Sequence, residues 1–277
     1  MLPREPHVSV IEGSILDFRR LDLLAREDSI IHRLDPRTKV LVTLAFILVV
    51  VSFDRYAVNA LLPFAIFPVA LMAVANLPTR FIAGKVLTVS FFAVAIGILN
   101  PLLDRQILIQ IDGIGISGGW LSFISILLRS ALTVTAALIL TATTGFGAIC
   151  QALERLGMPT IFARQLTFMY RYLFVLAEES QRMSNARELR SCRGTGMGIR
   201  PYASMIGHLL LRTWERAERI HRAMLCRGYK GNMVTQKSAG MRLWDLSFLL
   251  GWITLFVLLR IYDVPRLLGH LTMMPHL

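Results

Sequence analysis

Five long apolar segments restrict the fold of this chain more than any other feature of its sequence. They cover roughly residues 38–53, 56–76, 82–103, 120–143 and 243–262. A helix of about 20 apolar residues crosses the roughly 30 Å hydrocarbon core of a bilayer. The last four segments reach this length, and the first needs flanking residues or local thinning of the bilayer. We therefore predict an all-α polytopic membrane protein with about five transmembrane helices.

The charge of the chain is distributed unevenly around these segments. The formal net charge is +12, although 55% of the 277 residues are hydrophobic. This combination makes sense if basic segments lie at the cytoplasmic face of a membrane. Six basic residues between positions 19 and 39 precede the first span, so the N-terminus should be cytoplasmic. Nucleic acid is not an expected partner, because a DNA-binding module has no use for the apolar half.

These features divide the chain into four regions. We expect a cytoplasmic N-terminal segment (1–37), four transmembrane helices (38–143), a basic cytoplasmic region (144–242), and a C-terminal transmembrane helix with a tail (243–277). The N-terminal residues contain no apolar core flanked by basic residues, so insertion should rely on internal spans and not on a signal peptide. The outer loop "DRQILIQIDGIGISGG" alternates apolar residues around Asp112 and Gly113, which is typical of a short hairpin.

The basic region holds 16 Lys or Arg residues against 6 Glu and no Asp between positions 145 and 242. Its turn signals predict a short helix that stops at Gly157, a long helix from Thr160 to about Arg193, and another helix from about Pro201 to Arg227. The last helix is amphipathic, with one apolar face made by Ile206, Leu210, Thr213, Ala217, Ile220 and Met224. The spacing also predicts the i,i+4 ion pairs Glu215–Arg219 and Glu218–Arg222. Such helices belong at a membrane surface or against a partner protein.

The triplet Cys-Arg-Gly ends both long helices, at residues 192–194 and 226–228. Glycine just after a helix tolerates the left-handed conformation that closes it, and arginine in the last turn is favoured by the helix dipole. These roles in ending a helix can account for both triplets even if they have no part in binding. Two arginines at two helix ends could also contact acidic or carbonyl-lined grooves on another protein. Metal binding by Cys192 and Cys226 is disfavoured, because the three cysteines of the chain match no zinc pattern.

Several segments resemble one membrane-protein family in the order in which they occur. "ARELRSCRG" and "ERIHRAMLCRGYKG" resemble the two coupling-helix signatures of the transmembrane T component of energy-coupling factor (ECF) transporters. The family has Ala-Arg-Gly where this chain has Cys-Arg-Gly, and Cys is close to Ala in size. "SIIHRLDPRTK", "TTGFGAICQALERLGMP" and "MYRYLFVLAEE" resemble other parts of the same family. The similarity covers roughly residues 20–235.

The resemblance implies a coupling subunit that joins two cytosolic ABC-type ATPases to a small substrate-binding membrane protein. The ATPase-docking residues that it implies are Arg193, Gly194, Arg227 and Gly228, together with Cys192, Cys226, Ala186 and Met224. Two helices with similar ends suggest an X-like pair. The sequence contains no G-x-x-x-x-G-K-[ST] loop, so we expect a non-catalytic subunit without a cofactor or metal of its own, whose partners bind ATP. "LDLLAREDSIIHRLDPRTK" resembles the cobalt-type, CbiQ-like branch, which favours cobalt uptake across the inner (plasma) membrane.

Alternatives remain open at this point. Nickel or vitamin uptake would use the same type of subunit, since the substrate subunit selects the cargo. A membrane enzyme acting on lipid would need paired titratable groups, which the sequence does not show. If the chain is instead a basic scaffold that binds anionic membrane lipid, substitutions of Arg193 and Arg227 should matter no more than those of Arg212 or Arg216. Arg129 lies within the fourth span and is expected to reach a partner subunit, a carbonyl cluster or water.

Overall fold

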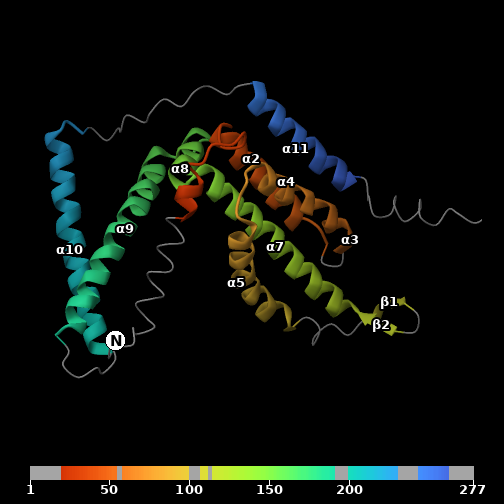
Figure 1. Ribbon diagram of the computed structural model, residues 1–277, viewed down its shortest axis with the longest axis horizontal. Coiled ribbons are helices and arrows are strands. Elements are labelled where there is room, and N and C mark those ends of the chain that lie inside the picture. The colour runs from red at the N-terminus through yellow and green to blue at the C-terminus, as the bar shows by residue number, and fades with distance from the viewer. Residues whose placement is uncertain are drawn as a thin grey trace, which may run out of the picture. The chain divides into compact units, whose positions relative to one another are not determined.

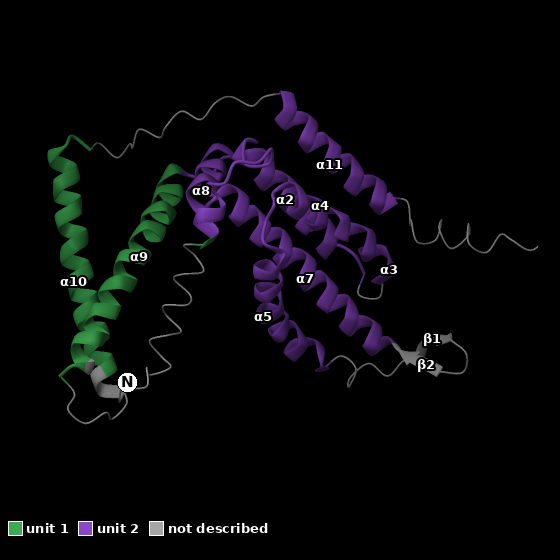
Figure 2. Ribbon diagram, viewed as in Figure 1, with its two compact units in different colours: residues 1–20, 160–240 green, residues 21–159, 241–277 purple. Residues whose placement is uncertain are grey.

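The computed structural model describes residues 20–54, 58–99, 107–111, 114–190, 199–229 and 243–261, and most of these residues are helical (Figure 1). They divide into two compact units (Figure 2). Unit 1 combines residues 1–20 and 160–240, and unit 2 combines residues 21–159 and 241–277. The apolar helices therefore belong to unit 2, and the long helices of the basic region belong to unit 1.

Unit 2 contains seven of the described helical elements, which are α2 (Pro36–Val51), α3 (Val58–Leu61), η1 (Leu62–Ala65), α4 (Ile66–Val74), α5 (Thr79–Gly97), α7 (Gly118–Thr144) and α11 (Leu243–Ile261), besides the short α8 described below. Three of them, α5, α7 and α11, are long and apolar enough to cross a membrane. The residues of α3 to α4 form a further apolar stretch, and α2 has 16 residues. The prediction of an all-α polytopic membrane protein is confirmed.

The second apolar segment is broken and does not form one regular helix. Proline has no N–H group, and its ring clashes with the preceding helical turn. Accordingly α3 ends before Pro63, which lies in the 3-10 turn η1, and α4 begins only at Ile66. The break directs Phe64 into the core, where its side chain is 1% exposed.

The loop before α7 forms the expected hairpin. Strand β1 (Ile107–Ile111) pairs antiparallel with β2 (Ile114–Ser117), with Ile109 opposite Ile116 and Ile111 opposite Ile114. The turn residues Asp112 and Gly113 lie outside the described residues. Apolar alternation was enough to predict this hairpin, because side chains along a strand alternate between its faces.

An aromatic cluster holds the apolar helices of unit 2 together. The ring of Phe46 in α2 lies 4.5 Å from that of Phe67 in α4 and 5.5 Å from that of Phe256 in α11, measured between centroids. Phe67 also meets Trp252 of α11 edge to face at 4.8 Å. Aromatic pairs at such distances add about 0.5–1.5 kcal/mol beyond the burial of their area. The cluster therefore ties the N-terminal and C-terminal apolar helices to each other.

Polar groups fasten the N-terminal end of α2. The Asp35 carboxylate caps the helix by accepting from the Arg37 backbone N–H at 2.9 Å, and the Asp35 N–H donates to Asp245 Oδ1 of α11 at 2.9 Å. Lys39 donates from Nζ to the Thr143 carbonyl at the end of α7, at 3.0 Å. Because Asp35, Lys39 and Asp245 are all at most 8% exposed, these contacts are shielded from solvent.

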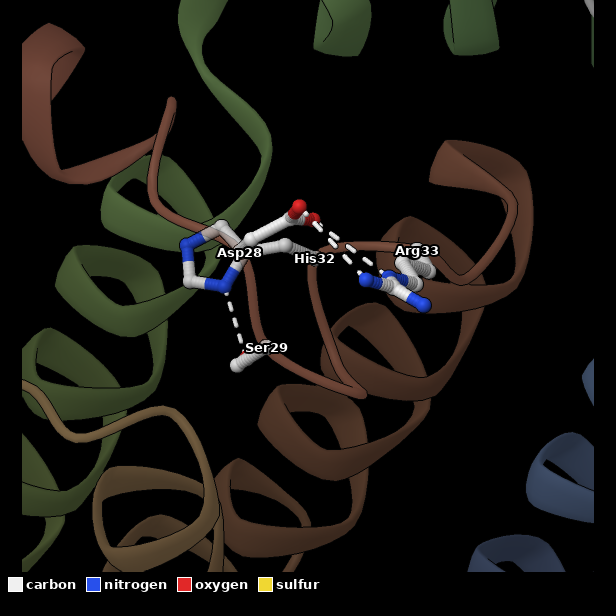
Figure 3. Close-up of polar contacts among 4 residues, drawn as sticks. All are labelled: Asp28, Ser29, His32 and Arg33. Carbon is white, nitrogen blue, oxygen red and sulfur yellow. Dashed lines mark hydrogen bonds and ion pairs between the residues drawn. The ribbon is translucent and has the colours of Figure 1, made fainter.

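The chain approaches α2 through a turn built around His32 (Figure 3). The imidazole Nε2 donates to the Leu24 carbonyl at 3.0 Å, and Nδ1 lies 2.7 Å from the Ser29 hydroxyl. Arg33 reaches back to the Asp28 carboxylate at 3.4 Å on the exposed side of the turn. The "SIIHRLDPRTK" segment is thus a connector that closes on itself before Asp35 caps α2.

Two arginines reach the opposite end of α2. Arg129 of α7 donates to the carbonyls of Val51 and Asp54, and Arg260 of α11 donates to the Ser52 carbonyl at 3.1 Å. The Arg260 guanidinium also lies over the Phe53 ring, 4.0 Å from its centroid. Cations are stabilised at a helix C-terminus, where carbonyl groups lack helical partners. Of the contacts expected for Arg129, the structure shows the carbonyl cluster.

The short amphipathic helix α8 (Phe146–Arg155) follows α7 in unit 2. It ends as the sequence predicts, at Gly157, whose φ is +114°. The Met158 N–H donates to the Leu153 carbonyl at 3.1 Å and closes the last turn. Unit 1 then begins with α9 (Thr160–Glu188), which is followed by α10 (Ile199–Cys226).

Candidate docking site

The described residues of unit 1 form an antiparallel pair of long helices that cross (Figure 1). Glu179 of α9 accepts from Arg212 of α10 and from Arg182 of its own helix. At one end of the pair, Arg164 donates to the Tyr229 hydroxyl at 3.1 Å. The expected X-like pair is therefore present, with polar contacts between its helices and at one pair of ends.

The C-terminal end of α10 has a defined conformation that places Arg227. Gly228 adopts φ +79°, the Tyr229 N–H donates to the Met224 carbonyl at 3.0 Å, and the Gly228 N–H donates to the Leu225 carbonyl at 3.0 Å. This pair of bonds is the Schellman motif, which requires a left-handed residue and therefore favours glycine. The predicted glycine stop is confirmed for this triplet.

The residues of the second triplet are open to solvent. Cys226, Arg227 and Gly228 are exposed, and Met224 is half-buried. The exposed thiol explains why cysteine can stand where the family has alanine: no neighbouring side chain has to accommodate its sulfur. The exposed Arg227 side chain thus extends from a backbone held by two hydrogen bonds. This arrangement presents a guanidinium, which carries five donors in a rigid fork, to an acceptor outside the helix.

The first triplet, Cys192, Arg193 and Gly194, lies outside the described residues. Helix α9 ends at Glu188, and the turn that follows is described to Arg190, whose N–H donates to the Arg187 carbonyl at 3.0 Å. Ala186, also expected at the docking site, is exposed on α9. The docking role of both triplets stays a prediction.

The predicted apolar face of α10 lies against α9 along an open groove. We call this the apolar groove; its volume is about 580 Å³, and it is lined on one side by Phe168, Tyr172 and Leu176 of α9. Five of the six residues expected on the face line its other side, namely Leu210, Thr213, Ala217, Ile220 and Met224. The two predicted ion pairs lie away from the groove and are present, Glu215–Arg219 at 3.7 Å and Glu218–Arg222 at 3.0 Å.

Within the described part of the chain, no group of three or more His, Cys, Asp or Glu side chains is placed to hold a metal ion. The described surfaces of α9 and α10 present guanidinium groups and apolar side chains.

Comparison with known proteins agrees with this architecture. Residues 27–238 match the family CbiQ, described as cobalt transport protein. The energy-coupling factor transporter transmembrane protein EcfT of Bacillus subtilis is 26% identical over 218 residues, which are 73% of this chain and 82% of that protein. A fused cobalt transport protein, CbiMQ, of Methanocorpusculum labreanum is 33% identical over 102 residues, 36% of this chain and 17% of that protein.

A further relative is matched over a shorter length. An uncharacterised protein of Methanocaldococcus jannaschii is 29% identical over 147 residues, and the chain spans half of that protein's length. The apolar helices define a polytopic membrane protein, and the family match places it among transport proteins. The chain belongs to the CbiQ family of cobalt transport proteins, and it is a transmembrane component of the energy-coupling factor type.

Proposed function

We propose that this chain is the non-catalytic subunit that couples two cytosolic ABC-type ATPases to a small substrate-binding membrane protein during cobalt uptake. The exposed Arg227 at the end of α10 carries the proposal, because a Schellman turn fixes the backbone that presents it. A docking arginine is effective only if its position is defined, since ordering a long side chain costs entropy on binding. Arg193, which lies outside the described residues, would supply the equivalent contact.

Membership of the CbiQ family supports this role, and the name of the EcfT relative places that protein in an energy-coupling transporter. ATP would be bound by the partner subunits, and the crossed helices would transmit their movement. Cobalt is the favoured cargo because the family description names it. The coupling helices and the N-terminus would then face the cytoplasm, with the apolar helices in the inner (plasma) membrane.

The test is purification of the tagged chain from its native membranes in mild detergent, followed by identification of what accompanies it. We expect two ATPase chains per transporter and a small membrane protein, with cobalt retained by that protein. Nickel in place of cobalt would show that nickel is the transported ion, and the coupling role would still hold. A preparation that retains anionic lipid but no ATPase, under conditions that preserve other membrane complexes, would contradict the coupling role and favour a lipid-binding scaffold.

A further inference from the structure

A second cleft on the α9–α10 pair is lined by charged side chains. It has a volume of about 790 Å³, and its charged or titratable lining residues are Glu179, Arg182 and Arg187 of α9, Arg190 in the turn after α9, and His208 and Arg212 of α10. We call it the basic cleft. Its described lining holds four arginines and one carboxylate, and Glu179 already accepts from Arg182 and Arg212. The cleft therefore keeps an excess of positive charge that its own carboxylate does not neutralise.

One guanidinium nitrogen in this cleft lacks an acceptor. Arg187 Nη1 is shielded from solvent and has no hydrogen-bond partner among the described residues. A buried donor without a partner costs free energy, and the cost is larger for a charged group. An anion in the basic cleft would supply the missing acceptor, and phosphate oxygens match the forked donors of arginine.

The basic cleft continues directly into the apolar groove along both helices. Glu179 and Arg182 line the cleft, and one turn earlier on α9 Val175 and Leu176 line the groove. On α10, His208 and Arg212 line the cleft, and Leu210 and Thr213 line the groove. The contact between Glu179 and Arg212 marks the boundary. A ligand that occupies both spaces has an anionic end and a long apolar end.

The groove side of the pair is unusually apolar for a surface with so many arginines. Trp214 is 72% exposed and Leu210 is 66% exposed, and both line the apolar groove. Exposed tryptophan and leucine beside basic residues are typical of helices that bind at a lipid interface. A free phosphate ion would leave the apolar groove empty, whereas a phospholipid would fill both spaces.

We propose that the basic cleft binds the phosphate of an anionic phospholipid and that the acyl chains of this lipid lie along the apolar groove. None of the residues that line the basic cleft belongs to a Cys-Arg-Gly triplet, although the cleft reaches the C-terminal end of α9 and includes Ala186 of the expected docking set. A bound lipid would link α9 to α10 beyond the direct contacts of Glu179. The proposal does not require ATPase docking, and either one can fail without the other.

Native mass spectrometry of the purified full chain in detergent, with equimolar phosphatidylglycerol and phosphatidylcholine, tests the site. We expect preferential retention of phosphatidylglycerol and its loss in Arg187→Gln/Arg190→Gln, with an apparent affinity lower by about tenfold or more. The matched control is Arg219→Gln/Arg222→Gln, which removes the same charge from an exposed part of α10 that lines neither space. Circular dichroism of both variants checks that the helices are retained.

Three outcomes would overturn the proposal. Equal retention of the two lipids would show that the phosphate-bearing anion is not recognised. Equal loss of phosphatidylglycerol in the test and control variants would show diffuse attraction to a basic surface. Full displacement of the lipid by inorganic phosphate, with phosphate alone stabilising the chain as well as the lipid does, would show a site for a free anion. Should the double variant lose helicity, the exposed Arg190→Gln alone replaces it in the same measurement.

Discussion

The two units of this protein differ in how far their described side chains are buried. In unit 2, Phe46, Phe67 and Phe256 are at most 2% exposed, and the buried Lys39 is satisfied by a carbonyl group of another helix. In unit 1, Trp214 is 72% exposed, and most charged contacts are ion pairs at the surface. Unit 2 therefore contains a buried aromatic core. Unit 1 exposes apolar and charged side chains that are available for binding to partners or lipid.

This difference separates the stability of the molecule from its interactions. Contacts in unit 2 join residues that are far apart in the chain, such as Asp35 and Asp245. Substitutions there should reduce stability and affect function only as a consequence. Substitutions on the exposed side of unit 1 should change binding and leave thermal stability nearly unaltered.

The largest contrast is expected between Phe46→Ala and Trp214→Ala. Removal of the fully buried Phe46 ring leaves a cavity among Phe64, Phe67 and Phe256 and should cost about 3–5 kcal/mol. Truncation of the exposed Trp214 should change the free energy of unfolding by less than about 0.5 kcal/mol. Thermal unfolding of each purified variant in the same detergent measures both. Similar midpoints for the two variants would remove the distinction between the units.

Lys39→Met should produce the next largest loss. The substitution removes the only described side-chain donor to the Thr143 carbonyl, in a buried region that also holds Asp35 and Asp245. Hydrogen bonds to charged groups contribute about 1.5–3 kcal/mol, and the variant should lose about this much. Arg222→Met, which removes a surface pair with Glu218, should cost about 0.3–0.5 kcal/mol. Denaturant titration monitored by Trp fluorescence compares them, and an equal loss would mean that the buried contact is not structural.

Gly228→Ala tests the turn that positions Arg227. A residue with a Cβ at φ +79° costs about 1–2 kcal/mol, so the helix end should lose its left-handed turn. Gly207→Ala within α10 is the matched control, because a Cβ there meets nothing within 4 Å. Removing a helix-interior glycine should stabilise α10 by about 0.4–1 kcal/mol. Hydrogen exchange at the Tyr229 amide should rise in the first variant only, and unchanged protection would contradict the role of the turn.

Arg260→Leu should have a smaller effect than Gly228→Ala. Arg260 is exposed, and its loss removes a donor to the Ser52 carbonyl and a cation above the Phe53 ring. Interactions of this kind at exposed sites contribute about 0.5–1 kcal/mol. Arg260→Lys should recover part of this, since lysine keeps the charge without the planar guanidinium. The measurement is again the unfolding midpoint. A loss of stability as large as that of Phe46→Ala would show that Arg260 contributes as much as a core residue of unit 2.

The elements that the sequence predicted correctly are those set by neighbouring residues. Runs of apolar residues predicted the membrane helices, alternation predicted the hairpin, and spacing predicted the apolar face of α10. Gly157 and Gly228 ended their helices as expected, because a left-handed turn is a local requirement. The break of the second span was missed although its signal was present, since Pro63 cannot continue an α-helix.

Contacts between distant segments could not be predicted in the same way. Asp35 meets Asp245 across 210 positions, and Lys39 meets Thr143 across 104. Nothing in the local pattern around Asp245 identifies this partner. The basic cleft was missed for a related reason: the arginines were read as one charged surface, and only the crossing of α9 and α10 gathers some of them around Arg187.

The central proposal is that Arg193 and Arg227 dock the ATPases. The most direct measurement is the amount of ATPase that co-purifies per chain from native membranes for Arg193→Glu/Arg227→Glu and for Arg219→Glu/Arg222→Glu. Both pairs reverse the same charge in the basic region. We predict that the first pair loses the ATPases, with the chain still in the membrane, and that the second retains them. Equal retention, or equal loss, in the two preparations would contradict docking through these arginines.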